Sequence, residues 1–150
     1  MKIFVDSSVL YSAMYSTTGA SAELLRLSQF HPQKIKLIYS FYVLLEVQAN
    51  LSSKASELLE YFEIFVDSID PKQIIDPTKS QIEKVAKYTD IKDAPIVAAA
   101  IKSKVDLLAT LDKKHLIRPL QVARKSKVKI VLPDQAFEQC RLCLNKNGAN

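Results

Sequence analysis

Three aspartates stand where an apolar segment ends or a helical segment begins. Asp6 follows the apolar run KIFV, Asp112 follows the segment VDLLAT with one leucine between them, and Asp93 opens the helical segment DAPIVAAAIKSK. Each has a simple explanation, because an aspartate at a helix N-terminus accepts hydrogen bonds from free backbone N–H groups. Carboxylates that converge, however, repel one another, and a divalent cation removes that repulsion. An oxygen-only set of ligands suits Mg²⁺ or Mn²⁺.

A fourth acid, Glu46, lies inside the helical segment FYVLLEVQANL. The residues one turn away from it are Tyr42, Val43, Ala49 and Asn50, so its helix face is mixed. Two interpretations are open: Glu46 is a charged residue on the solvated face of an amphipathic helix, or it is a buried charge that needs a partner.

Short apolar segments alternate with helical ones along the chain, which is typical of parallel sheets built from β-α-β units. We predict one α/β domain over residues 1–140, a three-layer α/β/α fold with a central parallel sheet of about five strands, and a C-terminal tail over residues 141–150. The predicted strands are 2–5, 34–40, 72–76, 105–110 and 128–133. The predicted helices are 7–15, 19–30, 41–51, 53–69, 76–89, 93–104 and 133–144, with a single turn at 113–117.

The order of these elements predicts where the acids meet. Ligands of open α/β sheets bind beyond the carboxyl ends of the strands. If the strands at 2–5 and 105–110 are neighbours, Asp6 and Asp112 share one rim of the sheet. The helix that precedes the second of these strands then presents Asp93 to the same rim. The sequence thus predicts an acidic pocket that holds a divalent cation.

The composition is that of an ordinary soluble domain, with 150 residues of which 48% are hydrophobic and 25% charged. No apolar run reaches the roughly 20 residues that span a bilayer, and the N-terminus lacks the pattern of a secretion signal. We therefore expect a cytoplasmic protein without membrane partners. The two cysteines, Cys140 and Cys143, have no further Cys or His pair with which to form a four-ligand zinc site. We interpret them as reduced structural residues.

The basic charge is concentrated in one segment. The chain carries a net charge of +5, and residues 113–129 hold seven Lys or Arg and no acid. Such a segment either contacts the phosphates of a polyanion or is a solvated face. We interpret His115, within this segment, as a packing residue or a phosphate contact and not as a catalytic group.

Five short motifs, in order along the chain, resemble those of PIN-domain proteins, including the toxin nucleases of prokaryotic toxin–antitoxin pairs. They are IFVDSSVL, LLEV, DAPIVAAAI, LLATLDKKHL and KIVLPDQAF, and the resemblance extends over residues 2–138. It implies a PIN-like fold and an Mg²⁺- or Mn²⁺-dependent endoribonuclease, with RNA as substrate, a cognate antitoxin as partner and a homodimer as assembly. By position it implies Asp6 and Asp112 as direct metal ligands and Asp93 as a ligand of the metal or of its water. Glu46 becomes a water-mediated ligand or base.

The resemblance also implies supporting residues. Ser8 and Thr110 match hydroxyl positions that orient the carboxylates, and Asp90 matches an acidic position found in part of the family. Leu111, beside Asp112, is bulkier than the family pattern has at this place. Because the basic segment begins directly after this acid, we predict that it binds the RNA backbone through Lys113, Lys114, Arg118, Arg124, Lys125 and Lys127.

Three other functions compete with this interpretation. A phosphoaspartyl phosphatase would use Asp6 as nucleophile, but it normally needs a second aspartate two residues on, where this chain has Ser8. A receiver-like signalling domain would need paired acids at the end of the first strand, and Asp6 has no acidic neighbour. A non-catalytic RNA-binding module with the PIN fold stays open, because its acids would look the same.

Overall fold

Four parallel strands form the central sheet of the computed structural model, which describes residues 1–146. The strands are β1 (Lys2–Val5), β2 (Lys36–Ile38), β3 (Leu107–Ala109) and β4 (Lys129–Val131), in the order β2-β1-β3-β4. β1 pairs with β3 directly, with Val5 opposite Ala109. The prediction that the strands at 2–5 and 105–110 are neighbours is therefore confirmed, and so is the prediction of an α/β fold with a parallel sheet.

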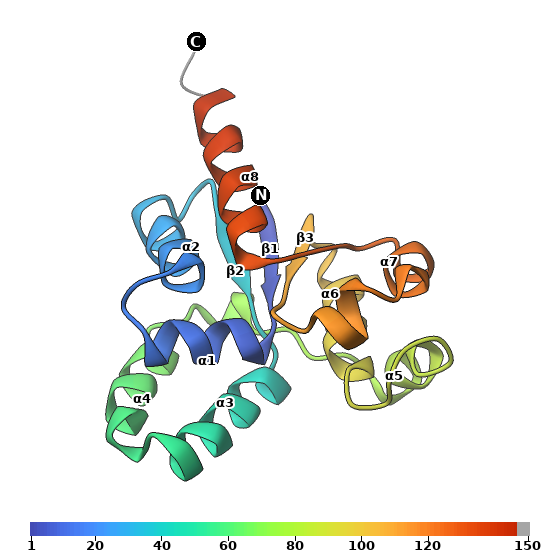
Figure 1. Ribbon diagram of the computed structural model, residues 1–150, viewed down its shortest axis with the longest axis horizontal. Helices are drawn as coiled ribbons and strands as arrows, with labels where there is room; N and C mark the ends of the chain where they lie inside the picture. The colour runs from blue at the N-terminus through green and yellow to red at the C-terminus, as the bar shows by residue number, and fades with distance from the viewer. Residues whose placement is uncertain (147–150) are drawn as a thin grey trace.

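Helices flank this sheet. In Figure 1 the strands lie at the centre of the molecule, with α2 to the left and α5, α6 and α7 to the right. The α-helices are α1 (Ser7–Tyr15), α2 (Ala20–Phe30), α3 (Phe41–Lys54), α4 (Leu59–Asp67), α5 (Lys79–Val85), α6 (Ala94–Ser103), α7 (Leu120–Ser126) and α8 (Pro133–Lys146). The shorter turns are η1 (Ser56–Leu58), η2 (Pro71–Gln73) and the π-helical turn η3 (Lys113–Ile117).

The core is built around β1 and α6. The side chains of Ile3, Phe4 and Val5 are completely buried. α6 contacts β1, and the run of buried alanines Ala98–Ala100 lets its backbone come close to the sheet. Because both elements are fixed by this core, the residues at the end of β1 and at the start of α6 are held in place.

The sheet has four strands where the sequence predicts about five. The predicted strand at 72–76 contributes a single bridge, between Ile74 and Tyr39. The reason is local: Pro71 has no backbone N–H, and the Asp70 side chain accepts a hydrogen bond from Lys72 N at 2.9 Å, which turns the chain. The chain comes beside the end of β2 only after this turn, so the segment after Gln73 forms one bridge and not a full strand.

Two helical predictions also need correction. The single helix predicted over 53–69 is divided: α3 ends at Lys54, and α4 begins at Leu59 after the turn η1. α7 is missing from the sequence prediction, because a short polar segment after Pro119 has little apolar periodicity. Only Val122 and Ser126 of this helix are buried.

α8 runs without interruption across residue 140, where the sequence analysis ends the domain. Residues 147–150 of the predicted tail lie outside the described part of the chain. Over residues 1–146, none of the helices combines the length and the apolar character needed to cross a membrane.

Candidate active site

Asp6 ends β1 and caps α1, as an aspartate between a strand and a helix is expected to do. Its Oδ1 accepts a hydrogen bond from Ser7 N at 2.7 Å, and its Oδ2 accepts from Ser8 Oγ at 2.9 Å and from Thr110 Oγ1 at 2.6 Å. Only 6% of Asp6 is exposed. Burial raises the pKa of Asp6 above its usual value, the charge of Glu46 adds to this rise, and the three hydrogen bonds oppose it.

Two hydroxyls connect the ends of β1 and β3. Thr110 Oγ1 donates to Asp6 and accepts from Asp112 N at 3.0 Å. Ser8 Oγ donates to Asp6 and accepts from Leu111 N at 3.1 Å. The structure thus places both predicted supporting hydroxyls on the Asp6 carboxylate, and the same hydroxyls hold the backbone that carries Asp112.

Asp93 occupies the N-cap position of α6, but its side chain does not cap the helix. Pro95 stands at the second helical position and has no N–H to donate, and Ile96 N bonds to the Asp93 carbonyl instead. Partial burial, and after it the charges of nearby carboxylates, first Asp112 and then Asp6, together raise the pKa of Asp93 to about 6. The capping explanation of Asp93 is therefore wrong, and a crowded carboxylate with a free side chain takes its place.

Asp112 caps the π-helical turn that follows β3. Its Oδ1 accepts from His115 N at 2.9 Å, and its Oδ2 lies 3.0 Å from His115 Nδ1. Burial opposes ionisation of Asp112, but the hydrogen bonds from the backbone and ring of His115 outweigh burial and hold the pKa of Asp112 below its usual value. Asp112 and Asp93 thus lie at one rim with pKa values shifted in opposite directions.

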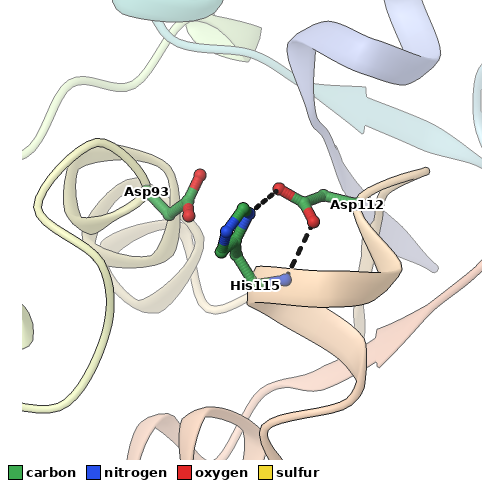
Figure 2. A group of neighbouring side chains, drawn as sticks. All are labelled: Asp93, Asp112 and His115. Atoms are coloured by element: carbon green, nitrogen blue, oxygen red, sulfur yellow. Dashed lines mark hydrogen bonds and ion pairs between the residues drawn. The ribbon is translucent and has the colours of Figure 1, made fainter.

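His115 lies between the two aspartates and bonds to one of them: Figure 2 shows its imidazole between the carboxyl groups, with both hydrogen bonds going to Asp112. One ligand atom from each of the three residues lies within 4.8 Å of the other two. The sequence interpretation of His115 as a packing or phosphate residue overlooked this position. The signal was its spacing of three residues from Asp112, which places the two on one face of a helical turn.

Glu46 is exposed on α3, so its place is the solvated face and not a buried position. Four residues earlier on the same helix, Tyr42 Oη donates to the Lys92 carbonyl at 3.3 Å and ties α3 to the turn before α6. Burial raises the pKa of Tyr42. The charges of Glu46, Asp93 and Asp6 raise it further.

Asp90 lies in the turn before α6 and is exposed. Its Oδ1 accepts from Lys92 N at 2.9 Å, which shapes the turn. The charge of Asp90 contributes to the raised pKa of Asp93. The structure therefore places Asp90 near the other acids but gives it a local structural bond.

The predicted RNA-binding residues all lie on the surface. Within residues 1–146 none of the six forms an ion pair, while Lys125 Nζ lies 5.7 Å from the centre of the Tyr88 ring. They are distributed over η3, α7 and the residue that follows each of these two elements: Lys113, Lys114, Arg118, Arg124, Lys125 and Lys127. Their contact with RNA remains a prediction.

The chemistry of this rim suits a divalent cation. Asp93 and Asp112 offer carboxylate oxygens that lie, together with a ring nitrogen of His115, within 4.8 Å of one another. Asp6 is not part of this group, but Thr110 joins its carboxylate to the backbone N–H of Asp112. Burial raises the pKa of Asp93 most, and the charges of Asp112 and Asp6 add to the rise; a bound cation would offset both effects. Hard oxygen donors favour Mg²⁺ or Mn²⁺, and the imidazole of His115 is a ligand better suited to the transition metals.

Comparison with known proteins identifies the family. A family model described as the PIN domain matches residues 3–119. The chain belongs to the PIN domain family. No curated protein matched the sequence.

Solved structures with the same fold include VapBC2 from Rickettsia felis, bound to a DNA fragment from its promoter (TM-score 0.62, 16% identity, 88% of this chain and 98% of that one). VapBC-1 from nontypeable Haemophilus influenzae is similar (TM-score 0.60, 14% identity, 89% and 98%). FitAcB from Neisseria gonorrhoeae is similar as well (TM-score 0.59, 16% identity, 87% and 97%). At these identities the likeness establishes the fold.

Proposed function

We propose that this chain is a divalent-metal-dependent endoribonuclease that acts as the toxin of a toxin–antitoxin pair. The observation that carries the proposal is the group of crowded acids at the carboxyl end of β1 and β3, in a chain of the PIN domain family. The sequence motifs shared with PIN-domain toxins and the fold shared with VapBC2, VapBC-1 and FitAcB support the same conclusion.

The acids have one chemical task in this proposal. A phosphodiester is anionic and repels hydroxide, so its hydrolysis needs positive charge at the site of attack. A divalent cation, when bound, supplies this charge and lowers the pKa of a water molecule. Asp6, Asp93 and Asp112 would hold the cation, and the hydroxyls of Ser8 and Thr110 keep Asp6 in one orientation.

The two remaining acids, Glu46 and Asp90, would affect cleavage without binding the cation. Glu46 is exposed on α3, where it can orient a water molecule or accept its proton. Asp90 shapes the turn that leads to Asp93 and adds negative charge behind it. Neither residue needs to contact the cation in order to affect cleavage.

Three further parts of the proposal concern partners. The basic surface of η3 and α7 contacts the phosphates of RNA, because it begins at the residue after Asp112 and carries no acid. A cognate antitoxin protein is supported by the shared motifs and by the fold likeness to VapBC2, VapBC-1 and FitAcB. The homodimer is proposed from the motif resemblance alone. The cytoplasm is the compartment in which such a protein would meet RNA.

A cleavage assay tests the proposal. Wild type and Asp6→Asn are incubated with 5′-labelled single-stranded RNA in Mn²⁺, in Mg²⁺ and in EDTA. We expect internal cleavage by wild type in either metal, none in EDTA, and a loss of at least about a hundredfold for Asp6→Asn, since replacing one ligand or its support typically costs that much. Asp67→Asn, which removes an exposed carboxylate at the end of α4, is the matched control and should cut like wild type.

The outcome also separates the competing functions. Asp6→Asn keeps the shape of the side chain, and circular dichroism verifies that the variant folds. Binding of RNA without cleavage in any metal would identify a non-catalytic RNA-binding module. Normal cleavage by Asp6→Asn, or by wild type in EDTA, would refute the acidic site.

A further inference from the structure

A cavity of about 570 Å³ lies at the outer edge of the sheet, where β2 ends the strand order β2-β1-β3-β4. Its lining comes from β2, from α2, and from the chain between the end of α4 and η2. Within residues 1–146 its lining contains none of the acids of the candidate active site. Gln73 and Ile75, on either side of the single bridge residue Ile74, line the cavity as well. It therefore lies where the predicted strand at 72–76 fails to pair with β2.

The backbone of β2 shows which of its groups face this cavity. Lys36 N donates to the Met1 carbonyl at 2.9 Å, so Lys36 faces β1. The next residue of a parallel ladder faces the other side, so the N–H and the carbonyl of Leu37 point away from β1. Two bonds agree with this direction: Gln73 Nε2 donates to the Leu37 carbonyl at 2.6 Å, and Tyr39 N donates to the Gln73 carbonyl at 2.8 Å. The Leu37 N–H thus points to the outer edge, where Leu37 lines the cavity.

The Leu37 N–H has no hydrogen-bond partner within residues 1–146. In a regular ladder it would donate to the Pro71 carbonyl, but in the turn η2 this carbonyl accepts from Ile74 N at 3.2 Å. Gln73 N likewise donates to the Asp70 carbonyl at 2.7 Å and not to β2. The side-chain amide of Gln73 replaces that second bond, whereas the first is not replaced in the described chain. Because Leu37 is 1% exposed, its N–H is an exception to the rule that buried backbone groups are paired.

An extended peptide matches the free groups of this edge. The Ile35 carbonyl points to the same side as the Leu37 N–H, because a peptide unit directs its carbonyl opposite to its N–H and Lys36 N faces β1. One residue of an added parallel strand would donate its N–H to Ile35 and accept with its carbonyl from Leu37. The cavity volume lies within the range of about 300–1,000 Å³ that is usual for binding sites. Proteins commonly recognise peptides by adding a strand to a free sheet edge.

The charge around the cavity favours an acidic peptide. Lys2, Lys36 and Lys72 line the cavity, and Asp70 is the one acid among its lining residues within 1–146. Lys2 and Lys36 are direct cross-strand partners, and like charges in such a pair repel each other. None of the three lysines forms an ion pair in the described part of the chain. Glutamate or aspartate side chains of a bound strand would offset this positive charge.

We propose that the outer edge of β2 is a docking site for an acidic, extended peptide segment of a partner protein, which pairs with Ile35 and Leu37 as an added parallel strand. The proposal goes beyond the proposed nuclease function and does not depend on it, because binding at this edge involves neither the acids nor a cation. The peptide would supply the bond that the turn η2 withholds from Leu37.

Nuclear magnetic resonance of the ¹⁵N-labelled full chain in EDTA tests the proposal with three probes. They are an octapeptide of alternating glutamate and threonine, an octapeptide of alternating lysine and threonine, and free glutamate. We expect the acidic octapeptide to shift the Leu37 amide saturably and to slow its hydrogen exchange, and the other two probes to do neither. An unchanged Leu37 amide with the acidic octapeptide would overturn the proposal. Equal effects of free glutamate would also overturn it, because they would identify a site for small anions.

A change in the peptide backbone separates strand addition from attraction between charges. Versions of the acidic octapeptide methylated at one central backbone nitrogen keep every charge and lose one N–H donor. Among the versions methylated at successive positions, at least one should bind about fivefold more weakly than the parent, the effect of losing one hydrogen bond. Equal affinity of all methylated versions would show that charge alone holds the peptide, and pairing with β2 would be refuted.

Charge variants of the protein test the choice of an acidic partner. Lys36→Gln combined with Lys72→Gln should weaken binding of the acidic octapeptide by about fivefold, since each exposed ion pair contributes little. Lys54→Gln combined with Lys84→Gln is the matched control, because both lysines are exposed on other helices and do not line the cavity. Equal binding by the two double variants, with native amide spectra, would contradict the proposal.

A fourth probe tests for the other kind of polyanion. An RNA tetranucleotide in EDTA should leave the Leu37 amide unchanged, because it offers no backbone N–H with which to pair. An RNA that shifts the Leu37 amide more than the acidic octapeptide does would make nucleic acid the occupant of this edge and would overturn the proposal.

Discussion

Asp93 is expected to reduce the stability of the metal-free protein near neutral pH. Its pKa is raised from 3.8 to about 6 by burial and by the charges of Asp112, Asp6 and Asp90. The folded state therefore binds more protons than the unfolded state between these two values. The contribution of Asp93 to stability is fully present below pH 4 and is lost as the pH rises through about 6.

The size of this effect follows from the pKa. Each tenfold change in a proton-binding equilibrium is worth about 1.4 kcal/mol, so the rise corresponds to about 3 kcal/mol before screening. Asp93 is only partly buried, and solvent screening reduces the effect to about 1 kcal/mol. Replacing Asp93 by asparagine, which has the same shape without the charge, should recover this amount.

Urea denaturation followed by circular dichroism provides the measurement. In EDTA at pH 7.5, Asp93→Asn should be more stable than wild type by about 1 kcal/mol, and at pH 4 the two should be equal. Glu63→Gln, which removes an exposed charge from α4, is the control and should change stability little at either pH. A variant less stable than wild type at pH 7.5 would show that Asp93 is held by favourable contacts, and the reasoning from repulsion would fail.

Three further predictions concern the same rim and the basic surface. Millimolar Mn²⁺ or Mg²⁺ should raise the melting temperature of wild type through binding to the folded state, and a thermal scan without a shift would count against the cation site. Thr110→Val removes the hydroxyl that donates to Asp6 and accepts from the backbone N–H of Asp112. This variant should lower the free energy of unfolding by about 2 kcal/mol. Thr110→Ser should restore it in the same denaturation assay, and equal losses in both variants would show that packing and not the hydroxyl matters. Reversing the charges of Arg124, Lys125 and Lys127 should weaken RNA binding and reduce the slope of log K against log salt by about 2, because each phosphate contact on a single strand contributes about 0.7. An unchanged slope in fluorescence anisotropy would reduce these residues to a solvated face.

Most of the fold could be predicted from the sequence, because few folds other than a parallel α/β sheet accommodate short apolar strands that alternate with amphipathic helices. The segment at 72–76 has the apolar residues of a strand, but whether it pairs is decided by the turn at Pro71 and by the position of β2. The sequence did not predict α7, because its two buried residues, Val122 and Ser126, have helical spacing but only Val122 is apolar.

Part of the candidate site could be predicted from the sequence. Asp6 and Asp112 could be found because acids at the ends of adjacent parallel strands must lie near one another. The free side chain of Asp93 depends on two things: Pro95 has no N–H at the second helical position, and the N–H of Ile96 bonds to the Asp93 carbonyl, which only the structure shows. His115 was overlooked, because its role depends on the orientation of a π-helical turn toward α6, which is a tertiary property.

The bond from Thr110 to Asp6 joins residues 104 positions apart, and both strands that carry them lie in the middle of the sheet. During synthesis the N-terminal strand emerges from the ribosome long before its neighbour exists. The rim of acids is therefore assembled only when most of the chain has been translated. A nascent fragment that ends before β3 lacks Thr110 and Asp112, so under the proposed function it would not have the complete cation site.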